Sequence, residues 1–271
     1  MKKMAGFGVA GNFAGHLEQA GEAESFRHVA VKESVAPKAV FPFYVPENPG
    51  FLSVYPLSSD TIVFPHLGDN LQIEPEVALI CQVNYEKEKV RSLKPLHFGA
   101  YNDCSIRNPH ARKISEKKNW GAQTKGISDV LIEIDRFEAG GVMDQYRIAS
   151  FLEREGTLFE YGVDSPVSGY SYFHQKLLDW IIEKINYQKD EDPVEPILPL
   201  LKQAGFPEKI IISIGATRYT SFGEKNFLAP GDTSIVILYN GTFFSSADIY
   251  ERIRSNRLKE NGISALVQKV I

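Results

Sequence analysis

A short, almost unbroken apolar run at residues 77–81 constrains the fold most strongly, because its length and composition suit a buried strand. The run reads VALIC, and Glu74, Pro75 and Glu76 stand directly before it. Proline cannot donate a backbone hydrogen bond to a neighbouring strand, so Pro75 favours a strand start or an edge strand. We therefore expect a strand over residues 76–83 that two acids introduce.

Several other segments carry strand or helix patterns. Strands are predicted at 61–65, 130–134, 209–215 and 233–240. A helix is predicted over 171–186, where Phe173, Leu177, Ile181 and Ile185 recur every four residues, and a second one over 245–260 after a serine cap. The Asn-Gly pair at 240–241 favours a tight hairpin turn, and the acidic stretch 188–196 favours a loop. This mixture predicts a β-rich α+β fold in a single domain over residues 1–271.

The overall composition excludes some classes of function. The formal net charge of −4 gives no general attraction to nucleic acid or to an anionic membrane. An apolar stretch of about 18 residues, which a membrane-spanning helix needs, is absent, and no secretory signal is recognised. Two cysteines, Cys81 and Cys104, are too few for a disulfide framework. We expect a cytoplasmic protein that binds neither nucleic acid nor membrane.

The two acids before the strand form a Glu-x-Glu pair. Residues two apart on a strand face the same side, so Glu74 and Glu76 project together. One interpretation is two solvated acids at a strand entrance. Carboxylates ~4 Å apart repel by about 1 kcal/mol in water and about 4 kcal/mol at an effective dielectric constant near 20. If the pair is buried it needs a counter-charge, and a divalent cation is the alternative interpretation.

A third acid follows about thirty residues later, in the segment GAYNDCSIR at residues 99–107. It supplies Asp103 beside Asn102, with Arg107 four residues on. Glu-x-Glu, a buried strand and then Asn-Asp-x-Ser-x-Arg resembles the metal site of the fumarylacetoacetate hydrolase superfamily. By this resemblance Glu74, Glu76 and Asp103 are the metal ligands and Arg107 binds substrate, whereas Asn108 stands where the family usually has aspartate.

Further segments resemble the same family in the same chain order. The segment GVAGNFAGHLEQAG at 8–21 places His16 at the family's histidine, and WGAQTKGISD at 120–129 places Lys125 at its lysine. Looser similarities occur at 60–65, 153–165, 210–220 and 227–238. The resemblance therefore runs from about residue 8 to about residue 241.

The resemblance implies a mixed β-sandwich roll, usually a homodimer, that holds Mg²⁺ or Mn²⁺ on three carboxylates. It divides the domain into an amino-terminal lid and histidine segment (1–55), a metal-binding β core (60–241) and a carboxy-terminal extension (242–271). The implied substrate is a small carboxylic acid of the 2-oxo or 1,3-dicarbonyl type, which is hydrolysed, cleaved at a C–C bond, decarboxylated or tautomerised. A divalent cation suits this chemistry because it stabilises an enolate.

The sequence also departs from the family pattern. The glutamate that pairs with the family's histidine is replaced by Gln19, which orients an imidazole but cannot stabilise its charged form, so Glu22 is the candidate to polarise His16. A lysine expected within 41–46 is missing, and Ala216 replaces a threonine that contacts the substrate carboxylate, although Thr217 is adjacent. Thr217 and Gln19 are therefore further candidates for substrate binding beside Arg107. Loss of a strong base affects hydrolysis more than decarboxylation or tautomerisation.

Plainer interpretations stay open for each residue. His16 as a surface histidine, Lys125 as a solvated lysine and Arg107 as a loop tether are alternatives to catalytic or binding roles. His66, His97, His110 and His174 lack the spacing of metal ligands, and Cys104 lacks a paired histidine, so we interpret all five as structural. At the level of the protein, the alternative to an enzyme is a relative that binds metal or a small acid with little catalysis. The glycines of 6–21 predict that the His16 segment is a mobile lid.

Overall fold

The computed structural model describes residues 1–29, 31–65, 70–107 and 111–271. Its strands are β1 (Ala5–Ala10), β2 (Ala39–Tyr44), β3 (Leu57–Ser58), β4 (Thr61–Ile62), β5 (Leu71–Gln72), β6 (Pro75–Glu86), β7 (Lys89–Asn102), β8 (Ser105–Ile106), β9 (Lys125–Ile127), β10 (Ile132–Glu133), β11 (Tyr146–Arg154), β12 (Thr157–Pro166), β13 (Lys209–Ser213), β14 (Thr233–Asn240) and β15 (Ile263–Val270). Its α-helices are α1 (His16–Gln19), α2 (His174–Tyr187), α3 (Ile197–Gln203) and α4 (Ser246–Arg254).

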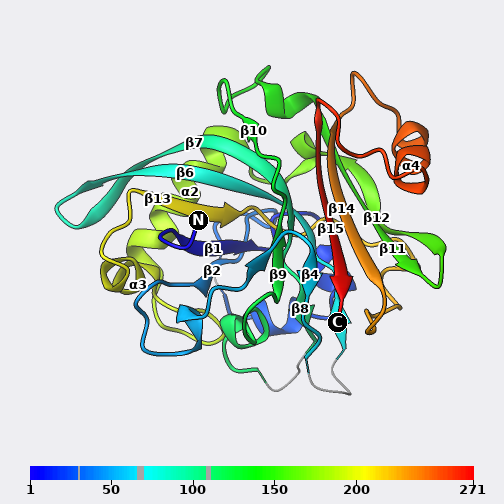
Figure 1. Cartoon of the computed structure of the whole chain (residues 1–271). Coiled ribbons are helices and arrows are strands. Elements are labelled where there is room, and N and C mark those ends of the chain that lie inside the picture. The colour runs from blue at the N-terminus through cyan, green and yellow to red at the C-terminus, as the bar shows by residue number, and fades with distance from the viewer. Residues whose placement is uncertain (30, 66–69, 108–110) are drawn as a thin grey trace.

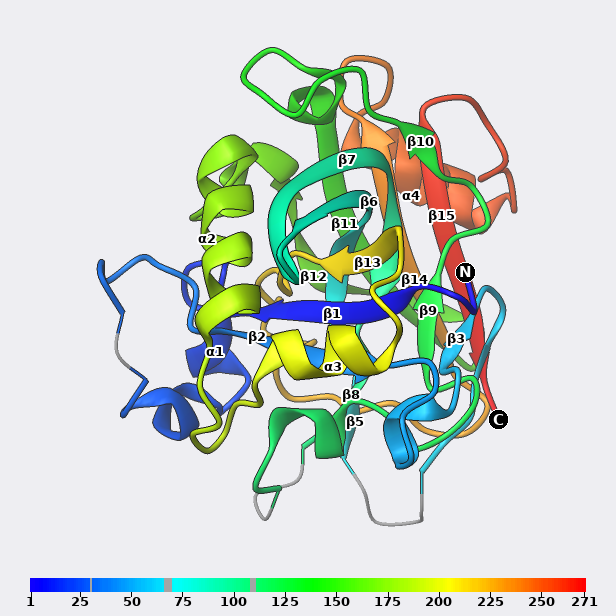
Figure 2. The same ribbon diagram turned by 90° about the vertical axis from the view of Figure 1, so that its left-hand side faces the viewer.

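The larger of two main sheets is mixed and curled. Its strands run in the order β2-β1-β13-β6-β7-β9-β3, with β10 also paired to β7. β6 and β7 form one long antiparallel hairpin, which bends across the molecule in Figures 1 and 2. β1 and β13 are parallel, so the amino-terminal strand lies in the interior of this sheet.

The second sheet has five strands in the order β12-β11-β14-β15-β4. It packs against the larger sheet through β11, β14 and β15, which contact β6 and β7. The main hydrophobic core fills the space between the sheets and continues under α2, with Leu79, Phe98, Ile148, Val236 and Leu266 among its buried members. The two layers of β-sheet confirm the predicted β-rich α+β fold of the mixed sandwich-roll type.

The helices lie outside these sheets. α2 presents Leu177, Ile181 and Ile185 to the core, which agrees with the predicted apolar face. α4 covers the five-stranded sheet on the side opposite the main core, in contact with a separate apolar cluster that includes Ile235, Ile237 and Ile249. Ser245 accepts a hydrogen bond from the Asp248 amide and forms the predicted cap of α4. The helix ends at Arg254, six residues before the predicted end.

Most predicted elements occur near their expected positions, and one turn does not. The predicted strands at 76–83, 209–215 and 233–240 are confirmed by β6, β13 and β14, whereas those at 61–65 and 130–134 shrink to two residues each. The tight hairpin predicted at 240–241 is wrong. β14 does pair with β15, but α4 is inserted between them, so Gly241 begins a longer connection.

Both ends of the chain contribute to the sheets. β1 and β2 come from the segment 1–55, so of its described residues only 11–29 and 31–38, between these two strands, remain as the candidate lid. β15 comes from the segment 242–271 and lies between β14 and β4, so this segment is part of the β core as well as an extension of it.

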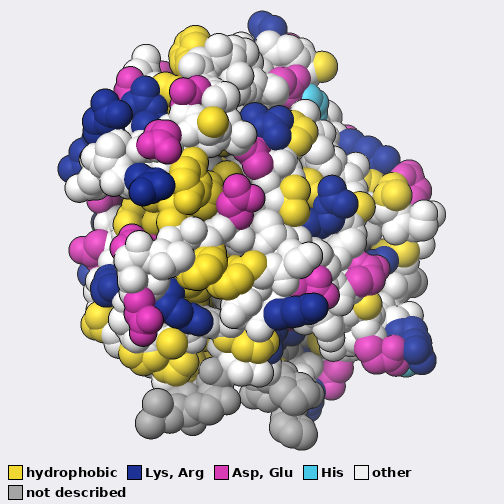
Figure 3. All heavy atoms as spheres, turned by 90° about the vertical axis from the view of Figure 1, so that its right-hand side faces the viewer, with side chains coloured by type: hydrophobic (Ala, Val, Ile, Leu, Met, Phe, Trp, Pro, Cys, Tyr) yellow, Lys and Arg dark blue, Asp and Glu magenta, His cyan; other side chains and the backbone are white. Residues whose placement is uncertain are grey.

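The surface on the side of α4 and β12 carries mixed side chains. In Figure 3 hydrophobic side chains gather near the middle of this face and Lys, Arg, Asp and Glu surround them. Across the described residues, helices that are long and apolar enough to cross a bilayer are not found.

Candidate metal and acid-binding site

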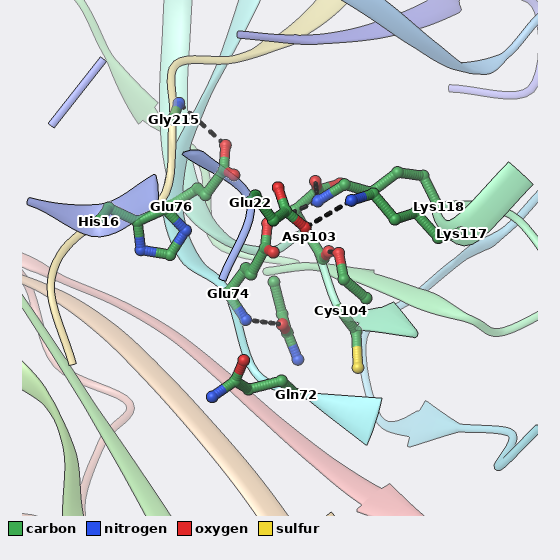
Figure 4. A network of polar contacts seen from close by, with 12 residues as sticks. His16, Glu22, Gln72, Glu74, Glu76, Asp103, Cys104, Lys117, Lys118 and Gly215 are labelled. Atoms are coloured by element: carbon green, nitrogen blue, oxygen red, sulfur yellow. Dashed lines mark hydrogen bonds and ion pairs between the residues drawn. The ribbon is translucent and has the colours of Figure 1, made fainter. Parts of the chain in front are cut away.

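Three buried carboxylates meet where the β6–β7 hairpin opens. Pro75 of β6 pairs with Asn102 of β7, so Asp103 lies beside the residues that precede β6. The Asp103 amide donates to the Glu74 carbonyl at 3.0 Å, and the Glu74 amide donates to Asn102 Oδ1 at 3.1 Å. Ligand oxygens of Glu74, Glu76 and Asp103 lie within 4.8 Å of one another, and each residue is at most 3% exposed. The antiparallel pairing of a strand start with a strand end therefore brings together the predicted acids (Figure 4).

Two lysines supply positive charge to this triad. Lys118 Nζ lies 2.6 Å from Glu74 Oε2 and 2.6 Å from Asp103 Oδ2. Lys125 Nζ lies 2.6 Å from Asp103 Oδ1 and donates to the Cys104 carbonyl at 3.1 Å. Lys125 is the predicted lysine. Lys118 was not predicted, because the stretch SEKKNW at 115–120 has the composition of a solvated loop.

The buried charges shift one another's pKa values in different directions. Burial disfavours the charged form of Glu74, but Lys118 and Arg107 outweigh it and hold the pKa of Glu74 well below 4.5. Burial and the nearby carboxylates of Asp103 and Glu74 raise the pKa of Glu76 well above 4.5. Burial lowers the pKa of Lys125 despite its contact with Asp103. Glu76, whose Oε2 accepts a hydrogen bond from the Gly215 amide at 3.0 Å, is thus the least compensated carboxylate.

His16 begins α1 and lines the same small cavity as Glu74 and Glu76. Its Nδ1 lies 3.0 Å from the Thr217 carbonyl, which only accepts, so Nδ1 carries the proton and Nε2 keeps its lone pair. Burial is the main cause of a lowered pKa for His16, so the ring is neutral at pH 7. The ring packs edge-on against Tyr219 at a centroid distance of 5.1 Å.

Gln19 and Glu22 do not make the contacts to His16 for which the sequence suggested them. Both atoms of the Gln19 amide bind the backbone of Tyr219, at 3.1 Å and 2.9 Å. Glu22 Oε1 lies 2.7 Å from Arg107 Nη1 and 2.6 Å from Lys117 Nζ. Burial by itself would raise the pKa of Glu22, but these two cations outweigh it and lower the pKa to about 2. Gln19 therefore tethers α1, and Glu22 acts as a counter-ion.

Arg107 connects the outer acid to the triad. Its Nη1 also lies 2.7 Å from Glu74 Oε1, its Nε donates to Gln72 Oε1 at 2.6 Å, and its Nη2 donates to the Tyr219 hydroxyl at 2.8 Å. The guanidinium is thus fixed on three sides. Thr217 contributes its backbone carbonyl to His16, and its hydroxyl lies 3.4 Å from the Pro75 carbonyl.

Two neighbouring cavities lead to these groups. The inner cavity, of about 10 Å³, is lined by His16, Glu74, Glu76 and Lys118 among others. Ala216, which stands where the family has a threonine, also lines it. The outer cavity, of about 160 Å³, is lined by Arg107, Lys113 and Lys117 among others. Glu22 and Ile114 line both. The inner cavity has room for about one water molecule, so this site is closed in the structure.

The remaining sequence candidates are partly outside the described part of the chain. Asn108, His66 and His110 fall outside the described residues. His174 Nε2 lies 2.8 Å from Asp144 Oδ1, away from the triad. Burial raises the pKa of the Cys104 thiol to about 12, which agrees with a structural thiol rather than a nucleophile.

Comparison with known proteins gives one family match. A family model described as "Family of unknown function (DUF5718)" matches residues 22–270. The chain belongs to this family. Sequence comparison with curated proteins gives no match.

Solved structures share the fold of this DUF5718 chain. "Crystal structure of Cg1458 with inhibitor" has 16% identity and a TM-score of 0.58, over 100% of this chain and 78% of the other. A 2-keto-3-deoxy-D-arabinonate dehydratase complexed with magnesium and 2,5-dioxopentanoate has 14% identity and a TM-score of 0.55, over 98% and 72%. A protein from Yersinia pestis CO92 that carries the name of the fumarylacetoacetate hydrolase family has 13% identity and a TM-score of 0.50, over 98% and 93%.

These likenesses concern the fold. They show that this DUF5718 chain shares its fold with a protein of the fumarylacetoacetate hydrolase family, the family that its Glu-x-Glu and Asn-Asp segments resemble.

Proposed function

We propose that the chain is a divalent-metal-dependent enzyme that acts on 2-oxo or 1,3-dicarbonyl acids by C–C hydrolysis, decarboxylation or tautomerisation. The observation that carries this proposal is the convergence of Glu74, Glu76 and Asp103 to within 4.8 Å in a buried site. The donors are all carboxylate oxygens, which suit Mg²⁺ or Mn²⁺ better than Zn²⁺. Glu74 Oε1 and Asp103 Oδ2 each already face a cationic group, Arg107 Nη1 at 2.7 Å and Lys118 Nζ at 2.6 Å, so both oxygens sit where a positive charge is stabilised.

The chain's own residues support proton transfer and acid binding at this site. A divalent cation, when bound, supplies a Lewis acid that stabilises negative charge on a chelating substrate. His16 presents an unprotonated Nε2 to the same cavity, so it is the candidate to take or return a proton. Lys125 holds Asp103 in place, and Arg107 together with Lys117 forms the cationic surface for a substrate carboxylate.

Closure of the site supports the exclusion of water during the reaction. Substrate entry requires the wall between the two cavities to open, and Glu22 of the candidate lid stands in that wall. The magnesium and dioxo-acid complex of the dehydratase with the same fold supports the substrate class.

The test is turnover of oxaloacetate and of an acylpyruvate in Mg²⁺ and in EDTA. We expect turnover only with metal, and we expect Glu76→Gln to lower it by about 10²-fold or more because a ligand is lost. Glu86→Gln is the matched control, because Glu86 is an exposed residue at the other end of β6. Full turnover in EDTA would contradict a metal-dependent reaction.

A second candidate function is binding without appreciable catalysis. It is favoured by the inner cavity of about 10 Å³ and by the position of Lys118 within the triad. Saturable Mn²⁺ binding in a protein that turns over neither substrate would support this alternative.

A homodimer is also part of the proposal. The surface groove between residues 128–130 and 256–260 encloses about 830 Å³ and exposes Val130 and Val267 at 48% and 41%. Sedimentation analysis should give twice the 30.4 kDa chain mass if the homodimer forms, and a single-chain mass would remove this part of the proposal.

A further inference from the structure

Lys118 lies where a cation shared by Glu74 and Asp103 would bind. Its Nζ is 2.6 Å from one oxygen of each carboxylate, and the residue is 3% exposed. Lys118 directly follows the 3₁₀ turn Ile114–Lys117. In Figure 4 its side chain reaches the triad from the side opposite His16. Phe41 lies beside the ammonium, with its ring centroid 5.2 Å from Nζ.

Lys118 and a divalent cation compete for the same two oxygens. Mg²⁺ binds oxygen at ~2.1 Å, which puts it in the space beside Glu74 Oε2 and Asp103 Oδ2 that Nζ fills. The Lys118 ammonium and a divalent cation bound to the same two oxygens would be only a few ångströms apart, and two positive charges so close repel strongly in a buried site. The inner cavity of about 10 Å³ offers no second place for an ion with its waters.

The charge balance of the buried groups also indicates that Lys118 and a divalent cation do not occupy the triad together. The connected ion pairs join the acids Glu22, Glu74 and Asp103 to the bases Arg107, Lys117, Lys118 and Lys125. With Glu76 included, four carboxylates face four basic side chains. A divalent cation added to this set leaves uncompensated positive charge in a buried site, which is costly unless a lysine leaves.

We propose that Lys118 is a displaceable internal cation: it holds the triad together in the metal-free protein and leaves the triad when a divalent cation binds. This inference rests on the proposed metal-dependent function. The apparent metal affinity of the natural chain then equals the intrinsic affinity of the open triad multiplied by the fraction of time for which Lys118 is out of it. Metal loading is also coupled to a movement of the segment 111–118, which lines the outer cavity.

The test compares Mn²⁺ binding by the natural protein, by Lys118→Met and by the matched control Lys117→Met. Binding is measured by the electron paramagnetic resonance signal of free Mn²⁺, so no substrate is needed. Both variants lose one positive charge at adjacent positions, but the Lys117 ion pair is with Glu22 at 2.6 Å. We expect Lys118→Met to bind Mn²⁺ at least about tenfold more tightly than the natural protein, and Lys117→Met to change less than about threefold.

The outcomes separate this inference from the proposed function. Binding that is equal in all three proteins, or tightened equally by both substitutions, overturns the displacement of Lys118 and leaves the metal site standing. Absence of Mn²⁺ binding from all three proteins overturns the metal-dependent function and this inference with it. Tight binding in Lys118→Met alone supports both.

A second measurement covers the case in which Lys118→Met does not fold. In the natural protein, the Lys118 Nζ resonance is assigned through Lys118→Arg and followed by ¹H–¹⁵N spectroscopy during addition of Mg²⁺. We expect its chemical shift and its slow exchange with water to be lost as metal binds. A resonance that stays unchanged at saturating Mg²⁺ overturns the proposal.

Discussion

The His16 ring takes its orientation from a backbone carbonyl rather than from an acidic side chain. Nδ1 lies 3.0 Å from the Thr217 carbonyl, and Gln19 binds the Tyr219 backbone two residues further on. The sequence could identify His16 through the motif around it. It could not identify the hydrogen-bond partner of Nδ1, because every residue has a backbone carbonyl and the one that binds His16 lies 201 positions away in the chain.

The first prediction concerns Gln19→Glu. A carboxylate cannot donate to the Tyr219 carbonyl, so the substitution should remove one hydrogen bond and place a charge against an acceptor. We expect a loss of about 1–3 kcal/mol in the free energy of unfolding, measured in urea. Gln82→Glu, at an exposed position of β6, is the matched control. Unchanged stability together with faster acylpyruvate hydrolysis would instead show that a carboxylate at position 19 reaches His16.

The second prediction concerns the pH dependence of the reaction. The pKa of His16 is lowered from 6.5, mainly by burial, so the neutral base predominates at pH 6.5 and above. We expect kcat/KM to stay level down to pH 6.5 and to fall only at more acidic pH, as Nε2 becomes protonated. His16→Gln should lower kcat/KM by about 10²–10⁴-fold and flatten this limb. A limb centred above pH 6.5, or one that persists in His16→Gln, would assign the base to another group.

At the scale of elements, aromatic rings of β2 pack directly over two glycines of β1. A Cβ added to Gly8 would lie 2.2 Å from Cζ of Phe41, and Phe41 is 2% exposed. Gly8 and the equivalent close contact at Gly6 with Phe43 therefore serve packing. The glycine content suggested a hinge over 6–21, but at these two positions it reflects an aromatic ring placed over the strand.

The third prediction tests this packing with Gly8→Ala. The added methyl group must displace a buried ring, so we expect a loss of about 1–3 kcal/mol in the free energy of unfolding. Gly169→Ala is the control, because its Cβ would meet Phe13 at an ordinary 3.6 Å. Equal stability of the two variants would show that β1 has room to move and would favour the hinge.

How well each element could be predicted depended on whether its pattern was local. β6, β13 and β14 are continuous apolar runs, and α2 has a clear four-residue repeat, so their sequences were sufficient. β1 and β2 carry glycine or proline and have no alternating pattern, because they are buried along their whole length. β15 was missed because its place between β14 and β4 depends on pairing across the chain.

At the scale of the whole molecule, one ion network joins four distant parts of the chain. Contacts of 2.6–2.7 Å link Glu22 of the candidate lid, Glu74 before β6, Arg107 after β8, and the two lysines at the end of the 3₁₀ turn, Lys117 and Lys118. Glu74 and Glu76 could be predicted as a pair from their spacing, and Asp103 could be added through the resemblance of its Asn-Asp segment to a known metal site. Their counter-ions could not, since Lys117 and Lys118 acquire partners only when the loop folds back over the triad.

The last prediction is that this network makes the fold sensitive to acid through Glu22. Arg107 and Lys117 outweigh burial and lower the pKa of Glu22 from 4.5 to about 2 in the folded protein. Because the pKa of Glu22 is lower in the folded state than in the unfolded state, the unfolded state binds the proton first as pH falls. The stabilisation by ionised Glu22 is therefore complete above pH 4.5 and is lost between pH 4.5 and about 2. We expect Glu22→Gln to lower the free energy of unfolding by about 3 kcal/mol at pH 7 and by clearly less at pH 3, from urea unfolding at both pH values. Glu24→Gln removes an exposed pair with Arg27 and should change stability by less than about 0.5 kcal/mol at either pH. A deficit in Glu22→Gln that is the same at pH 7 and pH 3 would mean that the charge of Glu22 contributes nothing to the stability of the fold.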